Sequence, residues 1–307
     1  MDMLRRVKLE YGLSDLKWIK TNQTFQSESG KKRIRIWKDK QLLQWHVKWR
    51  DEISKQSGIL LDRMIRTKDG EPFFICEKGW ATIHDEIEEV FPSSGKEKEW
   101  GRLLGTSLSY GLDHSDECQR FKKKQDIPLQ AVKKTIDQLT IIDPMAKIVL
   151  EKSYFEANRR SRKAIQLRER IQTKKLPILT PFNKLADAKE VFFNLFWVCG
   201  DQQPIKGYEP IRYLLEHWYV KNGETSTTKL LNAIEDYFPL KGDQGIILLT
   251  ECLIPSELER TVSQLQTRGN ETTDIMEEYF KKWETTRKLV ALLGNWIEED
   301  REKVVAR

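Results

Sequence analysis

The sequence has no apolar run close to the roughly eighteen residues that a membrane-spanning helix needs. Its first residues, MDMLRRVKLEYG, also lack the apolar segment of a secretory signal peptide. We therefore expect cytoplasmic synthesis without a signal peptide, and no membrane as a partner.

Cysteine and histidine are both scarce, with four of each. The cysteines lie far apart and form no C-x-x-C pair, which argues against a zinc site or a disulfide framework. No histidine has a second His or Cys at metal-ligand spacing. The G-x-S-x-G, Walker A and dinucleotide-binding signatures are absent as well. The sequence therefore predicts no metal site and no cofactor.

Positive and negative residues nearly balance, with 53 Lys or Arg against 47 Asp or Glu and a net charge of +6. Two segments depart from this balance, Lys31–Arg50 and Arg159–Lys175, and each holds eight bases and one acid. A segment of this kind is either a solvated face or a surface for an anionic partner. Composition alone leaves both interpretations open.

The pattern of residues 1–92 predicts a small sheet with one helix. Lys31–Trp37 alternates with a period of two, so it is expected to form a hairpin with Leu16–Lys20 across the polar segment TNQTFQSESG. After Asp39 the apolar residues recur every three or four positions, which predicts a helix with Leu42, Trp45, Trp49 and Ile53 on one face. Further strands are expected around and after the Asp69-Gly70 turn, at Leu60–Ile65, Pro72–Cys76 and Gly79–Ile83.

Residues 93–307 have a helical pattern. Asp143 and Pro144 are typical of a helix start, and we expect that helix to continue into the basic stretch ending near Thr173. Leu185–Cys199 includes VFFNLFWVC, which is apolar on nearly all sides and predicts a helix at the centre of the core. Other helices are expected at Glu209–Val220, Ser226–Tyr237, Ser256–Gln266 and Thr272–Val305.

One pair, His84-Asp85, invites comparison with the catalytic loop of phosphoryl-transfer enzymes. Such a loop needs an Asp that orients the acceptor hydroxyl and an Asn a few residues later that holds a metal ion. The residues after Asp85 are EIEEVFP, without an Asn. Because the pair directly follows strand-type alternation, we interpret it as the end of a strand and not as a catalytic loop.

Three segments in order carry a resemblance to a known family: the strand Gly30–Trp37, the helix around Trp45, and the turn Thr67-Lys68-Asp69-Gly70-Glu71-Pro72. On these residues the chain resembles bacterial spore-coat proteins of the CotS and YutH type, which are related to aminoglycoside and choline phosphotransferases. The segment TECLIPSELERTVSQL is similar to that family's late helix pair. The resemblance implies an α+β, two-lobed, protein-kinase-like fold, with a sheet-plus-helix lobe at 1–92 and a large helical lobe at 93–307.

The resemblance also implies that catalytic groups have been lost. The strand Lys that holds nucleotide phosphates in active relatives falls on or near Arg35, whose rigid guanidinium is not equivalent to an ammonium group. Its acidic partner would be Glu52, but we favour the simpler interpretation that Arg35 and Glu52 form an ordinary structural ion pair. Where the family has its His-Gly-Asp loop and metal-binding Asp, the interval Ile171–Phe182 contains only QTKKLPILTP. The segment after it, Phe182–Ala186, has Lys184 where the family has a helical Asp.

From this resemblance we expect a catalytically inactive, pseudokinase-type structural or scaffolding protein that has spore-coat proteins as partners and resides in the spore coat. An active small-molecule phosphotransferase is the alternative. A basic nucleic-acid-binding protein is a second alternative, because RIRIWKDKQLLQWHVKWR interleaves aromatic rings with bases. Those rings fall on the face that the helix needs for packing, so nucleic acid is not the expected partner.

The second basic segment is the expected partner surface. We predict that Arg159, Arg160, Arg162 and Lys163 bind an acidic protein surface. The alternative is a solvated helix whose charge is neutralised by Glu277, Glu278 or the Glu-Glu-Asp run near the end of the sequence.

Overall fold

The computed structural model describes residues 2–86, 94–120, 129–139, 143–173, 175–182, 188–191, 194–268 and 271–305. The chain divides into two compact units. The first unit joins Met1–Pro92 with Thr180–Gln203, and the second joins Ser93–Leu179 with Pro204–Arg307. Within the described residues, no helix combines the length and the apolar character that crossing a membrane requires.

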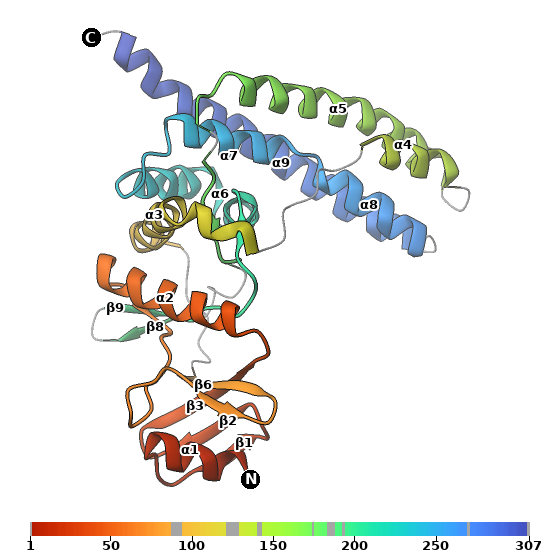
Figure 1. The fold of residues 1–307 in the computed structure, drawn as a ribbon. Coiled ribbons are helices and arrows are strands. Elements are labelled where there is room, and N and C mark those ends of the chain that lie inside the picture. The colour runs from red at the N-terminus through yellow and green to blue at the C-terminus, as the bar shows by residue number, and fades with distance from the viewer. Residues whose placement is uncertain are drawn as a thin grey trace. The chain divides into compact units, whose positions relative to one another are not determined.

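A five-stranded antiparallel sheet is the centre of the first unit, in the order β1-β2-β3-β6-β5 (Figure 1). Its strands are β1 (Lys17–Lys20), β2 (Thr24–Ser27), β3 (Gly30–Trp37), β5 (Phe74–Cys76) and β6 (Gly79–Asp85). The prediction that β1 and β3 form a direct hairpin is wrong, because β2 lies between them in the sheet. Phe25 of the polar segment explains the difference. Its ring is completely buried, and this burial holds the segment in the sheet as β2. The interpretation of His84-Asp85 as a strand end is confirmed, because β6 ends at Asp85.

The two faces of this sheet differ chemically, because successive residues of a strand point to opposite sides. One face carries Ile34, Ala81 and Ile83, which pack with Val7 of α1 (Met3–Tyr11) in an apolar cluster. The other face carries residues of the opposite parity, among them Arg33, Arg35, Trp37, Thr82 and His84.

Helix α2 (Lys40–Ser57) follows β3 and confirms the predicted helix. It begins after Asp39, whose carboxylate accepts hydrogen bonds from the backbone amides of Gln41 and Leu42. Its buried apolar residues are Leu43, Trp45, Trp49 and Ile53. The helix contacts the polar face of the sheet, where the His46 ring lies 5.0 Å from the ring of Trp37.

A second, three-stranded sheet completes the first unit, in the order β4-β9-β8. Here β4 (Leu60–Leu61) runs parallel to β9 (Asn194–Trp197), which pairs with β8 (Ala188–Val191). The predicted helix at Leu185–Cys199 is therefore wrong. A short, continuous apolar run suits a buried strand as well as a buried helix, and its aromatic and β-branched residues favour the strand.

The second unit is mainly helical. Its helices are α3 (Glu97–Asp113), α4 (Leu129–Gln138), α5 (Pro144–Glu169), α6 (Glu209–Glu235), α7 (Asp243–Leu253), α8 (Ser256–Thr267) and α9 (Thr272–Val305), with a 3₁₀ turn at Ser115–Arg120. A short pair joins β7 (Ile178–Leu179) to β10 (Ile205–Lys206). The two helices expected between Glu209 and Tyr237 are present as the two parts of α6, which are separated at Gly223, where the backbone is not helical and φ is 78°.

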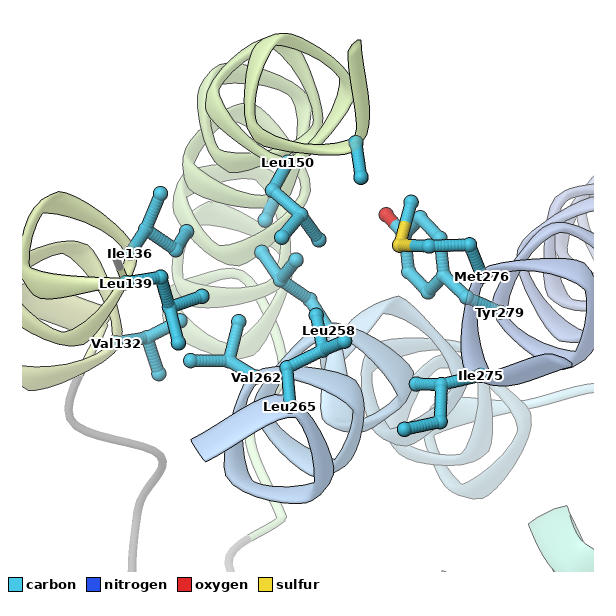
Figure 2. Close-up of a cluster of buried hydrophobic side chains, with 12 residues drawn as sticks. Val132, Ile136, Leu139, Leu150, Leu258, Val262, Leu265, Ile275, Met276 and Tyr279 are labelled. Atoms are coloured by element: carbon cyan, nitrogen blue, oxygen red, sulfur yellow. The ribbon is translucent and has the colours of Figure 1, made fainter. Parts of the chain in front are cut away.

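The core of the second unit includes a cluster in which α4, α5, α8 and α9 meet (Figure 2). Leu150 of α5, Leu258 of α8 and Tyr279 of α9 are each at most 1% exposed. Asp143 starts α5 as predicted, because its carboxylate accepts a hydrogen bond from the Ala146 amide. This packing fixes which side of α5 faces the protein and which side faces solvent.

Candidate functional site

The polar face of the five-stranded sheet holds a chain of buried hydrogen bonds. The carboxylate of Asp62, which follows β4, contacts His84 Nδ1 at 2.8 Å and accepts a hydrogen bond from Arg33 Nη2 at 2.7 Å. His84 Nε2 lies 2.8 Å from the hydroxyl of Thr82, and Trp37 Nε1 donates to the same hydroxyl at 2.9 Å. Asp62, Thr82 and His84 are all fully buried.

The partners of His84 define its tautomer. An ionised carboxylate can only accept, so Nδ1 carries the proton and donates it to Asp62. Nε2 of the neutral ring then accepts from the Thr82 hydroxyl, which itself accepts from Trp37. Each hydrogen bond of His84 then has one donor and one acceptor when the ring is neutral.

Burial agrees with that assignment. It lowers the pKa of His84 to about 4, although the neighbouring Asp62 carboxylate opposes the shift. Burial alone would raise the pKa of Asp62, but His84 and Arg33 hold that pKa well below its ordinary range. His46 is also buried, and burial lowers its pKa well below the ordinary value.

We expect the free energy of unfolding to fall as the pH is lowered from 6.5 towards 4. In this window the unfolded chain binds a proton at His84 with an ordinary pKa near 6.5, whereas the folded protein keeps the ring neutral. His84 alone should cost about 2 kcal/mol between pH 8 and pH 5, and His46 adds to the loss in the same direction. Urea denaturation at a series of pH values checks this, and an unchanged pH dependence in a His84→Gln variant would contradict it.

A second group of bonds on the same face holds the segment that follows β9. Arg35 donates from both terminal nitrogens to the Cys199 carbonyl, at 3.2 Å each, and its Nε lies 3.5 Å from the Asp201 carboxylate. Arg50 of α2 donates to the Gly200 carbonyl at 2.7 Å and shares the Cys199 carbonyl at 3.5 Å. Two guanidinium groups, one from β3 and one from α2, thus converge on the same short stretch of backbone.

We call Arg33, Arg35 and Arg50 the arginine cluster. Its three positive charges face three carboxylates, those of Asp62, Glu86 and Asp201. Burial, and next the positive charge of Arg50, lowers the pKa of Arg35 to about 10, so Arg35 stays charged at neutral pH. The cluster is balanced internally, and Arg35 already has acceptors at all three of its nitrogens.

Other chemistry has little support in this region. Burial raises the pKa of the Cys199 thiol to about 11, which leaves it protonated and unreactive at neutral pH. Within the described residues, no three His, Cys, Asp or Glu side chains come together as a metal site would require.

The fold defined by these units is that of the kinase-like phosphotransferases. The crystal structure of an aminoglycoside phosphotransferase from Alicyclobacillus acidocaldarius superposes with a TM-score of 0.64 and 10% identity, over 96% of this chain and 95% of that one. Spectinomycin phosphotransferase in complex with ADP and spectinomycin gives a TM-score of 0.54 and 13% identity, over 96% and 97% of the two chains. A choline/ethanolamine kinase family protein from Mesorhizobium loti gives 0.50 and 10%, over 96% and 98%.

At these identities the likeness shows the fold alone, which is aminoglycoside phosphotransferase-like with two lobes. The predicted fold class is confirmed. No protein-family model matches the sequence, and no curated protein does either.

Kinases of this fold bind nucleotide phosphates with a Lys on the third strand, and a Glu on the next helix pairs with that Lys. The structure places Arg35 on the third strand, but Glu52 of α2 pairs with Lys55 at 3.3 Å, whereas Arg35 contacts Asp201. The two predicted remnants are therefore not brought together. The α2 residue that does reach the environment of Arg35 is Arg50, which sequence reasoning missed.

The interval Ile171–Phe182 contains the short strand β7 (Ile178–Leu179). Strands β8 and β9 lie later, at Ala188–Val191 and Asn194–Trp197, and Asp201 follows them. The stretch between α5 and α6 therefore continues beyond Ile171–Phe182, and the ten residues QTKKLPILTP are only part of it. Most of the predicted Phe182–Ala186 segment, including Lys184, lies outside the described residues.

The predicted basic surface lies on α5, but one of its four members faces inwards. Arg160 is 8% exposed and pairs with Glu257 at 2.5 Å, and its guanidinium lies 4.9 Å from the Trp283 ring. Arg159, Arg162 and Lys163 are exposed. The expectation that all four bases are available to a partner is therefore corrected to three.

This difference predicts opposite outcomes for neighbouring substitutions. Arg160→Ser should lower the free energy of unfolding by about 3–5 kcal/mol, because it leaves the buried Glu257 carboxylate without its partner. Arg162→Ser, the matched control two residues away, should change it by no more than about 0.5 kcal/mol. Urea denaturation measures both variants, and equal midpoints would contradict the assignment.

Proposed function

We propose that this chain is a catalytically inactive protein of the kinase-like phosphotransferase fold, and that it has a structural or scaffolding role. The observation that carries the proposal is that Arg35, on the third strand, has Arg50 of α2 and not Glu52 beside it, and that the two guanidinium groups share one backbone acceptor. In an active kinase the strand Lys holds the phosphates and the helix Glu neutralises and orients it. Two positive charges cannot form such a pair, because Arg50 cannot neutralise Arg35 as the Glu neutralises the Lys.

The hydrogen bonds of Arg35 support the same conclusion. A nucleotide phosphate at this position would have to displace the Cys199 carbonyl or the Asp201 carboxylate. Both acceptors come from the same unit as Arg35, so they lie beside it without any ligand. The arginine cluster therefore serves to anchor the segment after β9, which is a stabilising role.

An assay of phosphoryl transfer tests the proposal. We expect no ATP consumption above the background rate with Mg²⁺ and the acceptor classes of the structural neighbours, namely aminoglycosides, spectinomycin, choline and ethanolamine. Turnover that is abolished by Asp201→Asn would overturn the proposal.

One observation favours the alternative of an active phosphotransferase. Asp201 follows β9, as a metal-binding Asp follows a strand in kinases, and its side chain is 46% exposed. If the alternative holds, Asp201→Asn abolishes turnover while the fold persists. If our proposal holds, this substitution affects only the ion pair with Arg35.

The spore-coat setting comes from the resemblance at Gly30–Trp37, the Trp45 helix and the Thr67–Pro72 turn. We propose that the partners are other coat proteins. A fluorescent fusion expressed in a sporulating bacterium should gather around the developing spore. A diffuse signal throughout the mother cell would argue against the coat assignment and would leave the question of catalysis to the turnover assay.

A further inference from the structure

Helix α5 has an inner and an outer side that are defined by its 3.6-residue period. The inner side carries Leu150, Ala157 and Ala164, which are buried, and Leu150 and Ala157 belong to the cluster of Figure 2. Six of the exposed residues on the outer side form what we call the α5 stripe: Met145, Ile148, Phe155, Arg159, Arg162 and Lys163.

The α5 stripe is divided along the helix axis. Its first half carries three large apolar side chains, Met145 at 65%, Ile148 at 44% and Phe155 at 69% exposure, with the exposed Lys152 among them. Its second half is basic. Large apolar side chains that gather at one end of an exposed helix face, next to a basic end, are typical of a surface that is covered by a partner.

The basic half borders two hollows. A groove of about 770 Å³ runs beside the helix, and its lining includes Phe155, Arg159, Arg162 and Arg170. A second hollow of about 360 Å³ lies between α5, α7 and α9, and Arg159, Lys163 and Arg287 line it. Both hollows are therefore rimmed by positive charge.

Carboxylates of the described residues neutralise only part of this charge. Arg159 pairs with Glu156 at 2.7 Å on the same helix, and Arg287 pairs with Glu284 at 3.7 Å. Among the described residues, Arg162 and Lys163 take part in no ion pair. Glu278, which was one of the acids expected to neutralise this helix, forms an ion pair with Lys282 instead. A partner that supplies carboxylates would meet unpaired cations here.

We propose that the α5 stripe is the docking surface for an acidic amphipathic helix of another protein, with the acidic half of that helix on Arg159, Arg162 and Lys163 and its apolar half on Phe155, Ile148 and Met145. Helix-in-groove recognition of this kind combines apolar anchors with charge complementarity. Arg162 can hold a carboxylate through two parallel hydrogen bonds.

The division along the axis distinguishes this partner from two others. A helix that lies on a membrane needs apolar residues along its whole length, with bases at the flanks. A nucleic-acid backbone would use only the basic half and would leave Phe155 and Ile148 exposed to water. A second helix matches both halves at once.

The same division sets the orientation of the docked helix. Acidic residues stabilise a helix when they lie in its N-terminal half, near the positive end of its dipole. For these residues to lie on the C-terminal half of α5, the partner helix must run antiparallel to it. The bound segment should therefore be acidic first and apolar afterwards.

This inference names a partner for the scaffolding role proposed above and rests on that role only for its biological setting. The binding experiment contains no nucleotide, so its failure leaves the proposed lack of catalysis untouched. Measured phosphoryl transfer, conversely, would not affect the docking surface.

The probes are two labelled peptides of about 20 residues, which matches roughly 30 Å of helix. One has Glu at helical spacing in its first half and Leu in its second half, and the other has the two halves exchanged at the same composition. Fluorescence anisotropy with the full chain should show binding of the acid-first peptide and at least tenfold weaker binding of the exchanged one. No detectable binding of the acid-first peptide, or equal binding of both, would overturn the proposal.

Variants complete the test. Combined replacement of Arg159, Arg162 and Lys163 by Ser should lower the affinity for the acid-first peptide at least tenfold. Phe155→Ser should lower that affinity by a similar factor. A control with Lys17, Lys20 and Lys40 replaced by Ser, which removes three exposed charges from the first unit, should bind as the parent does. If a DNA or RNA oligonucleotide or an anionic lipid vesicle binds instead, with sensitivity to the basic residues and none to Phe155, the surface is an anion surface and the proposal is wrong.

Discussion

Replacing Asp62 with Ala is expected to lower the free energy of unfolding by about 3–5 kcal/mol, because breaking a buried charged pair leaves buried donors without their acceptor. Arg33 Nη2 would lose its 2.7 Å acceptor, and His84 Nδ1 would lose the carboxylate that fixes its tautomer. Because Asp62 is fully buried, water cannot replace the carboxylate without rearrangement. Urea or guanidinium denaturation with an unchanged m-value measures the loss.

Asp201→Ala is the matched control for this prediction. Asp201 also contacts an arginine of the cluster, but its side chain is 46% exposed and the distance to Arg35 is 3.5 Å. Its loss should cost less than about 1 kcal/mol. Similar losses of unfolding free energy in both variants would show that the buried hydrogen bonds of Asp62 do not stabilise the first unit in the way described.

Gly101→Ala should also destabilise the protein, although Ala is the better helix former by about 1 kcal/mol. A Cβ on Gly101 of α3 would lie 2.3 Å from the Ala233 Cβ and 2.6 Å from the Ala233 carbonyl carbon of α6. Because backbone atoms must move to make room, the overpacking cost of about 1–3 kcal/mol, or more, exceeds the propensity gain. Thermal and urea denaturation should both show the loss.

Gly294→Ala of α9 provides the opposite expectation. No heavy atom lies within 4 Å of a Cβ at this position, so the substitution should stabilise the protein by roughly 0.5–1 kcal/mol. If both variants changed stability in the same direction, close packing between α3 and α6 would not explain why position 101 is a glycine.

The helices with clear local signals could be predicted from the sequence. Asp39 and Asp143 cap α2 and α5 through their own carboxylates, and both starts were visible as residue types. The turn at Thr67 is similarly local, because Gly70 has φ of 82° and donates to the Thr67 carbonyl at 3.0 Å. Such features depend on residues a few positions apart.

The strands β8 and β9 could not be predicted in the same way. The period of their apolar run does not distinguish a helix from a strand, and the strand is fixed by the distant pairing of Leu60 and Leu61 with Phe196 and Trp197. This pairing also brings Thr180–Gln203 into the first unit. A prediction from the local spacing of apolar residues alone assigns the same residues to the helical part of the chain.

The candidate site was predicted in part. Arg35 was identified by its place on a strand that follows Gly30, whereas Arg50 was counted only as one base among the eight of Lys31–Arg50. Arg50 is fully buried and Lys32 is 5% exposed, so part of that segment is neither a solvated face nor a partner surface. One signal was available, because Asp62 directly follows the apolar residues Ile59–Leu61, and an acid beside such a run is a candidate for a buried pair.

Calorimetric titration of the full chain with ATP in the presence of Mg²⁺ tests most directly the claim that the arginine cluster replaces a nucleotide site. We predict no heat beyond that of dilution, since Arg35 is held by the Cys199 carbonyl and Asp201, and Arg50 donates to the same carbonyl. Saturable binding with a Kd of about 1 mM or tighter, lost in the Asp201→Asn variant, would contradict the account and would favour an active phosphotransferase.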